Sequence, residues 1–104
     1  IFEAMQAVFE RFDLLVTPSV AVPAFQARAP GTVPMNPQSM LGWTPFSYPF
    51  NLTQQPAITV PCGLTRDGLP IGVQLVGPMF GDAVVLRAAR AYESVQGVAR
   101  PLLD

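Results

Sequence analysis

The sequence contains no histidine and no lysine, and its single cysteine is Cys62. Without histidine, the chain cannot assemble a Ser-His-Asp or Cys-His nucleophile, because both need an imidazole base. One thiol is too few for a zinc site, so we expect no metal, and the residues indicate no cofactor. A phosphate-binding P-loop would need its lysine. The sequence therefore predicts no catalytic residue of its own.

Charge of either sign is scarce as well. Charged residues make up 12% of the chain, where about 25% is typical of soluble domains. The arginines are dispersed and offset by acidic residues, so we expect no nucleic-acid partner. No apolar run approaches the ~18 residues of a bilayer span, so we expect no membrane partner. A lone cysteine, unable to form an internal disulfide, favours a cytoplasmic location.

Apolar residues, by contrast, are abundant, at 50% of 104 residues. Residues 1–12 place Phe2, Met5 and Phe9 at helical spacing, which predicts an amphipathic helix. The chain begins inside this pattern, so we expect it to be a piece of a longer protein. The run at 14–17 is typical of a strand covered on both faces. A helix that leads into a buried strand indicates the α/β class.

Residues 18–45 show no period and contain six of the twelve prolines. Loops of this length are uncommon in compact domains unless they have a function or are disordered. The segment includes large apolar residues such as Trp43, so we expect it to lie across a surface or cleft. A crossing loop with no functional role is the alternative.

Two apolar segments, 57–60 and 71–76, flank a turn at Asp67-Gly68, which predicts an antiparallel hairpin. Together with residues 14–17 this hairpin would form a mixed sheet. The alternation places Leu75 on one face and Gly72 and Gln74 on the other. A glycine at position 72 suggests the close approach of another backbone. Pro61 either ends the first strand or marks a bulge.

A second helix is predicted between an N-cap at Asp82 and a terminating glycine at position 97. Its small residues would let it lie close to the sheet. The stripe expected to face inward consists of Val85, Ala88, Ala89, Tyr92 and Val95.

Few residues stand out as candidates for chemistry. Cys62 has no neighbouring base and is expected to be a buried, inert thiol. Asn51 and Gln74 are amides among apolar neighbours, and each would bond either to its own backbone or to a ligand. Four aromatic residues could line an apolar pocket or simply fill the core: Trp43, Phe46, Tyr48 and Phe50.

The segments 13–18 (DLLVTP), 46–63 (FSYPFNLTQQPAITVPCG) and 67–93 (DGLPIGVQLVGPMFGDAVVLRAARAYE) resemble the C-terminal end of the amidase signature family. The resemblance implies cleavage or transfer of amides by a Ser–Ser–Lys triad without histidine or metal. The family carries that triad upstream of the matched region. This chain has no lysine and no serine at a motif position, so no catalytic residue is carried over.

The resemblance also implies what the chain contributes. Residues 1–104 would be the C-terminal part of a single amidase domain: α/β, with a mixed β-sheet packed by helices and a long loop at 18–45. Its partners would be the remainder of the amidase chain and a small amide substrate, and a homo-oligomer is left open. The residues implied to bind substrate are Trp43, Phe46 and Asn51.

Two departures from the family pattern bear on function. Relatives usually have glycine where Gln54 stands, which questions the tight packing of residues 51–56. The glutamine-using subunits of tRNA amidotransferases tend to place an acidic residue where Thr44 and Pro45 stand, so a general amidase for neutral amides is favoured over such a protein. A non-enzymatic α/β module, structural or self-associating, is the rival interpretation.

Overall fold

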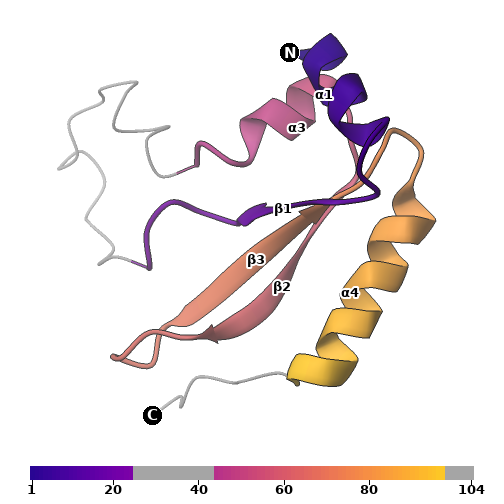
Figure 1. Ribbon diagram of the computed structural model, residues 1–104. Helices are drawn as coiled ribbons and strands as arrows, with labels where there is room; N and C mark the ends of the chain where they lie inside the picture. The colour runs from indigo at the N-terminus through magenta and orange to yellow at the C-terminus, as the bar shows by residue number, and fades with distance from the viewer. Residues whose placement is uncertain (25–43, 98–104) are drawn as a thin grey trace, which may run out of the picture.

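The structure of the protein is a computed structural model that describes residues 1–24 and 44–97. Figure 1 shows a long hairpin with a helix alongside it, and two shorter helices at the end of the sheet where the last strand finishes. Trp43 and most of the Pro-rich stretch lie outside the described residues. The elements, in chain order, are α1 (Phe2–Phe9), β1 (Leu15–Pro18), α3 (Tyr48–Thr53), β2 (Ala57–Leu64), β3 (Pro70–Val76) and α4 (Asp82–Gln96).

The three strands form one sheet in the order β1-β3-β2, and β3 pairs antiparallel with both neighbours. The predicted hairpin is confirmed. Its turn closes with a hydrogen bond from Thr65 N–H to the Leu69 carbonyl (2.8 Å), and Gly68 has the positive φ of 81° that the turn requires. The helices and strands together confirm the α/β class. All strand pairs within the described residues are antiparallel, so the mixed sheet stays a prediction.

The bulge is the second of the two roles foreseen for Pro61. Pairing continues past this proline, and the register shifts between Pro61 and Gly63. Since β2 lies at the edge of the described sheet, a proline without an N–H group is tolerated there.

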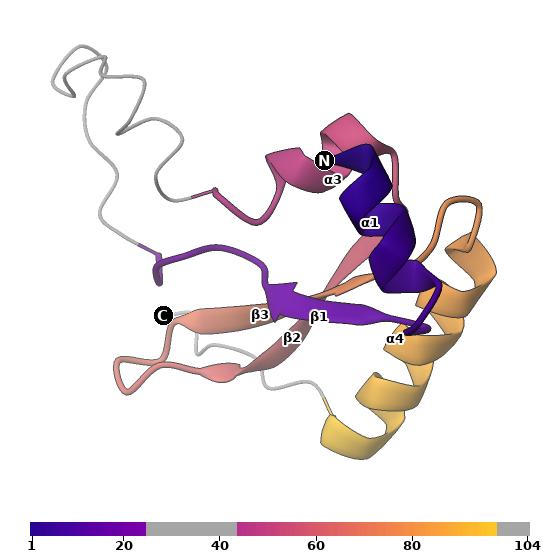
Figure 2. The same cartoon turned by 45° about the horizontal axis from the view of Figure 1, so that its top comes forward.

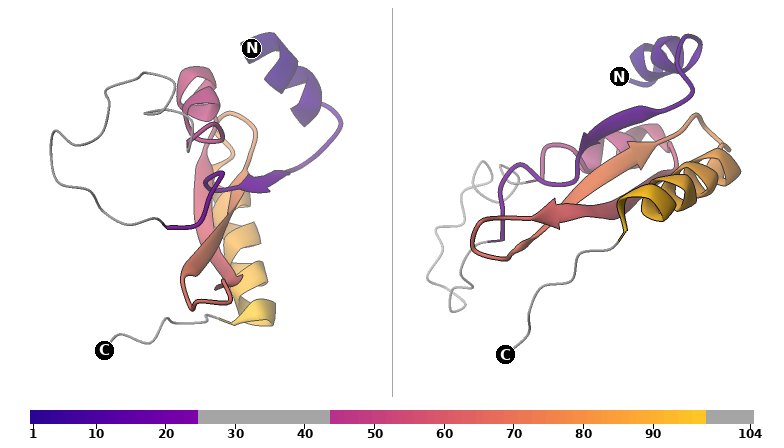
Figure 3. Two further views of the ribbon diagram at one scale, coloured as in Figure 1. Left: turned by 90° about the vertical axis from the view of Figure 1, so that its left-hand side faces the viewer. Right: turned by 60° about the horizontal axis from the view of Figure 1, so that its bottom comes forward.

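The helix α4 covers one face of the hairpin, as the two views in Figure 3 show. Val60, Leu75 and Ala89 form the buried core of this layer. The side chain of Val95, expected to face inward, is 88% exposed. It lies in the last turn, about 80° around the helix from Val85, at the margin of the apolar stripe.

The C-terminal end of α4 was predicted correctly from the sequence, and the N-cap was not. The N-cap is Gly81 and not Asp82, which is the first helical residue and makes no side-chain capping bond. An acidic residue in the first turn still complements the helix dipole, which explains the misleading signal. Gly97 ends the helix as expected, and its N–H donates to the Glu93 carbonyl (2.9 Å).

The edge strand β1 is more open than the sequence suggested. Residues 14–17 were expected to be covered on both faces, but the side chain of Val16 is 59% exposed. The reason is that α4 packs on β2 and β3 and leaves β1 uncovered. The apolar side of α1 is only partly open: Phe2 is 41% exposed, whereas Met5 and Phe9 are half-buried. On β3 only the first part is open, because Leu75 and Val76 are buried. None of the helices in the described part is long and apolar enough to cross a bilayer.

Candidate functional site

The face of the sheet away from α4 carries a row of polar side chains. In the strand register, Thr17 of β1 and Thr59 of β2 both lie opposite Gln74 of β3. Side chains alternate along a strand, so these three residues share the face opposite that of Leu75. The side chain of Gln74 is 8% exposed, so a polar amide is buried in the middle of this face.

The Gln74 amide links two segments that are far apart in sequence. Its Nε2 atom donates to the Phe46 carbonyl (2.8 Å) and to Thr17 Oγ1 (3.0 Å). The Thr17 hydroxyl donates to the Pro18 carbonyl (3.0 Å), so it can only accept from Gln74. Both partners therefore require an N–H donor, which fixes the orientation of the amide. The backbone partner of Gln74 is therefore in a distant segment, and not the local backbone that the sequence suggested.

A second link lies beside the first. Ser19 N–H donates to the Gly72 carbonyl (3.2 Å), and Ser19 Oγ donates to Thr59 Oγ1 (3.1 Å). A Cβ atom at position 72 would lie 2.8 Å from Thr59 Cγ2 and 2.9 Å from Ser19 Oγ. Only glycine fits there. The expected close approach at Gly72 is therefore real, but the crowding atoms belong to side chains and not to another backbone.

The helix α3 presents one of the predicted site residues. Its buried side is formed by Phe50 and Thr53, whereas Asn51 is exposed. Phe46, just before the helix, is half-buried and has its carbonyl bound by Gln74. Trp43 lies outside the described residues. The structure therefore places Phe46 against the sheet and Asn51 on the open side of α3.

The segment after α3 packs well despite Gln54. This residue is the C-cap and adopts the left-handed conformation, with φ 60° and ψ 28°. Glycine adopts that conformation without steric cost, which gives a physical reason for the glycine that the family resemblance implies at this position. Thr53 and Gln55 are nevertheless buried, and the Thr53 hydroxyl lies in hydrogen-bonding contact with Gln55 Oε1 and with the Pro49 carbonyl (2.9 Å). The doubt about the packing of residues 51–56 is not supported.

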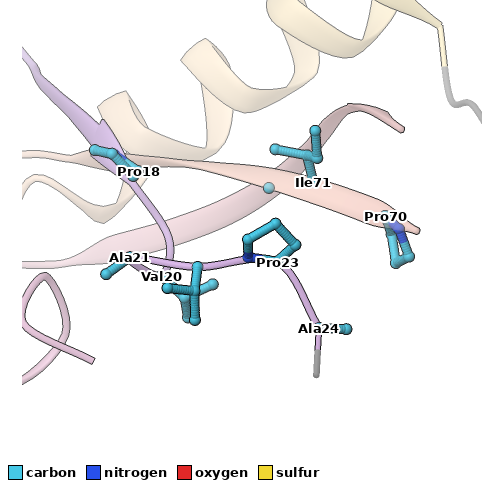
Figure 4. A pocket seen from close by; sticks show the side chains of 9 residues that line it. Pro18, Val20, Ala21, Pro23, Ala24, Pro70 and Ile71 are labelled. Carbon is cyan, nitrogen blue, oxygen red and sulfur yellow. The ribbon is translucent and has the colours of Figure 1, made fainter. Parts of the chain in front are cut away.

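A cavity of about 420 Å³ lies between the start of β3 and the segment that follows β1 (Figure 4). Its lining is formed by Pro18, residues 20–24, and residues 70–72. All of these residues have apolar or no side chains, so the cavity offers backbone groups as its only polar contacts. Ligand sites combine an apolar lining with a few placed polar groups. The cavity is open to solvent at Val20, Val22 and Ile71, and its side chains offer no hydrogen bond to an amide.

The described residues show neither a metal cluster nor a thiol paired with an imidazole. Among residues 1–24 and 44–97, no group of three His, Cys, Asp or Glu side chains could hold a metal ion. Cys62 is a free thiol. It is half-buried, whereas the sequence analysis expected it to be fully buried. Histidine and lysine, two common activating bases for a hydroxyl or thiol, are both absent from the sequence. The arrangement therefore holds the segment before α3 against the sheet through Gln74.

The model of the Amidase family matches residues 1–86. The chain belongs to the amidase family. Among curated relatives, the A subunit of glutamyl-tRNA(Gln) amidotransferase from Myxococcus xanthus (strain DK1622) is 41% identical over 91 residues, which are 88% of this chain and 18% of that protein. Its counterpart in Geotalea daltonii is 45% identical over 85 residues, which are 82% of this chain and 17% of that protein. This amidase-family chain thus spans less than a fifth of these relatives.

Solved structures show the same relation. The crystal structure of the A subunit of glutamyl-tRNA(Gln) amidotransferase from Thermotoga maritima superposes with a TM-score of 0.81 and 33% identity, covering 95% of this chain and 21% of that one. A bacterial aryl acylamidase of the amidase signature family gives a TM-score of 0.81 and 31% identity, covering 97% and 23%. Both likenesses confirm that the chain has the fold of a part of the amidase signature enzymes.

The polar row was only half visible in the sequence. Gln74 is recognisable in the sequence as an amide among apolar neighbours, but its register neighbours Thr17 and Thr59 are not recognisable as members of the same row. Each is a polar residue in an otherwise apolar strand, and that was the available signal. Pairing them required the strand order and register, which residue patterns alone do not supply.

Proposed function

We propose that this chain is the C-terminal part of an amidase-signature hydrolase that cleaves carboxylic amides. The observation that carries the proposal is the family match over residues 1–86, supported by the TM-score of 0.81 with an aryl acylamidase. The family match also favours the hydrolase over a non-enzymatic α/β module. The lone, free Cys62 fits the cytoplasm, where we place the enzyme.

In this proposal the chain supplies structure, and the remainder of the enzyme supplies the chemistry. The Ser–Ser–Lys triad would lie in the remainder, since this chain has no lysine. The exposed apolar side chains of the fragment would pack against that remainder. Supporting this, several large side chains remain open at α1, β1 and α3, among them Phe2, Val16 and Leu52. Burying each such side chain contributes about 1.5–3 kcal/mol.

The proposed substrate wall consists of Trp43, Phe46 and Asn51. Asn51 is exposed on α3, so its amide is free to face a ligand or the rest of the enzyme. An amide side chain offers both a donor and an acceptor, which matches the two polar atoms of a substrate amide. Phe46 would supply an apolar surface beside it.

A second candidate is the glutamine-using component of a tRNA-dependent amidotransferase. It is favoured by identities of 41–45% to proteins of that kind. Against it, Thr44 and Pro45 provide no charged side chain where such proteins tend to have an acidic residue. A neutral wall favours neutral amides over glutamine, whose α-amino group carries a positive charge.

The test is an assay of the full-length protein encoded by the reading frame that contains this chain. Release of ammonia or amine would be measured from propionamide, benzamide, an anilide and glutamine. We expect turnover of the neutral amides and none of glutamine. Glutamine turnover alone would support the amidotransferase, and no turnover of any substrate would overturn the amidase proposal. The separate 104-residue chain should match the buffer control.

A matched pair of substitutions tests the wall. Asn51→Ala should raise KM for the neutral amides by about tenfold, because one hydrogen-bonding group is lost from the pocket. Gln96→Ala, an exposed amide at the end of α4, is the control and should leave KM unchanged. Equal KM values for the two variants would show that Asn51 does not bind the substrate.

A further inference from the structure

We propose that Gln74 is a positioning residue for the substrate wall. Its buried amide holds the segment that leads into α3 and thereby sets where Phe46 and Asn51 lie. This inference rests on the proposed function of residues 46–51. Gln74 itself would touch no substrate, because both of its N–H groups already bond within the protein.

The anchor stands on the most constrained strand of the described sheet. The strand β3 is hydrogen-bonded along both edges, to β1 and to β2. The face of β3 that does not carry Gln74 is covered by α4. Leu75, next to Gln74, belongs to the buried core. Because the donor Gln74 lies on such a strand, its hydrogen bond restricts the position of the Phe46 carbonyl. A buried amide that left its partners unsatisfied would be costly, which keeps the contact formed.

The held segment continues directly into the helix. Ser47 N–H donates to the Thr44 carbonyl (3.2 Å), and Asn51 N–H donates to the Ser47 carbonyl (3.4 Å). Phe46 lies inside the turn formed by the first of these bonds. Fixing its carbonyl therefore fixes the turn and the first turn of α3, which carries Asn51. Figure 2 shows this segment and α3 above the sheet.

The two ends of α3 are held by different means. Phe50 and Thr53 are buried and anchor the later part of the helix, whereas the Gln74 amide binds the turn before it. The same amide also binds Thr17, so it joins the two residues that flank the Pro-rich stretch 18–45. Loss of the amide should therefore loosen residues 44–50 and leave the end of α3 and the hairpin core in place.

The kinetic test compares Gln74→Met with Gln96→Met in the full-length protein. Methionine keeps the length of the side chain but donates no hydrogen bond. We expect Gln74→Met to raise KM for neutral amides about tenfold with kcat within about twofold, because a displaced wall loses binding common to ground and transition states. A purely structural role would lower kcat through a smaller active fraction at unchanged KM. That result, or no change, would overturn the proposal.

A second measurement is independent of activity. Hydrogen exchange followed by mass spectrometry should show the amides of residues 44–50 exchanging about tenfold faster in Gln74→Met, with α4 unchanged. Equal acceleration in α4 would mean global destabilisation and would overturn the positioning role. If the wild-type protein hydrolyses no amide, the proposed function fails, while this exchange pattern still decides whether Gln74 anchors the segment.

Discussion

The two faces of the sheet are built in different ways. The face under α4 is apolar and assembled from one continuous stretch, since β2, β3 and α4 follow each other in the chain. The opposite face joins three segments that are far apart in sequence, through the hydrogen bonds of Gln74 and Ser19. Apolar packing is non-directional and tolerates small shifts, whereas the hydrogen bonds need one strand register. The first face therefore stabilises the fold, and the second positions a segment on it.

The largest expected loss of stability comes from a charge placed in the apolar core under α4. Leu75→Asp should destabilise the full-length protein by more than about 4 kcal/mol, because it buries a charge that has no partner. Urea unfolding followed by circular dichroism would measure this loss. Gln96→Lys is the control on the same helix, and it should change the free energy of unfolding by less than about 0.5 kcal/mol, since Gln96 is an exposed polar residue in the last turn of α4. Similar losses for both variants would contradict the observed packing of α4.

The second-largest expected effect distinguishes the polar face from the α4 face, because the loss of stability on the polar face should depend on pH. Gln74→Glu replaces both donors with oxygens that face the Phe46 carbonyl and Thr17 Oγ1. Burial and these acceptors favour the protonated acid, so the pKa of the introduced carboxyl should rise above its usual ~4.3. We expect a loss of about 2 kcal/mol at pH 8.

That loss should shrink as the pH falls through the raised pKa, because the protonated acid donates one hydrogen bond again. Unfolding measured from pH 8 down to pH 5, relative to wild type, checks this trend. Gln96→Glu, at an exposed position, should show no such recovery. A loss that is constant with pH would count against the donor role of Gln74.

A smaller effect tests the crowding at Gly72. Gly72→Ala should cost about 1–2 kcal/mol, since its Cβ atom would lie 2.8 Å from Thr59 Cγ2. Adding Thr59→Ser removes that methyl group and keeps the hydroxyl that Ser19 binds, so the double variant should recover part of the loss. Additive losses in this double-mutant cycle, measured by urea unfolding, would show that the methyl group is not the obstacle.

The smallest expected effect is a gain. Gln54→Gly should stabilise the protein by about 0.5 kcal/mol, because glycine adopts the left-handed C-cap conformation without a Cβ clash. The same change inside a helix, Gln6→Gly in α1, should instead destabilise by about 1 kcal/mol. Thermal unfolding of the two variants should shift in opposite directions. A shared sign would mean that the φ of 60° at Gln54 carries no strain.

Much of the α4 face was predictable. The Asp67-Gly68 turn, the β-branched run before it and the helix ended by Gly97 are local signals, and the structure confirms each of them. The errors at Asp82 and Val95 concern the two ends of α4, where helix boundaries are least sharply set by local sequence. The exposure of Val16 was not predictable, because an apolar run does not reveal how far a covering helix reaches.

The candidate site depended more on the tertiary structure. Phe46 and Asn51 were suggested by family resemblance, and nothing local to them indicates that one lies against the sheet while the other is exposed. Gln74 was noticed, yet its partner on β1 is 57 residues away in sequence. A pattern can mark a buried amide, but it cannot say which distant carbonyl the amide binds.

By itself, then, the sequence determined most of the elements, the hairpin and the absence of histidine and lysine, whereas the short helix α3 was not predicted. These follow from the periodicity of side chains, the backbone freedom of glycine and the chemical nature of the residues present. Only the tertiary structure decided that β1 pairs with β3 and that Gln74 joins Thr17 to Phe46. Hydrogen bonds between distant segments depend on register and on the direction of each donor, and both are set when the whole sheet is assembled.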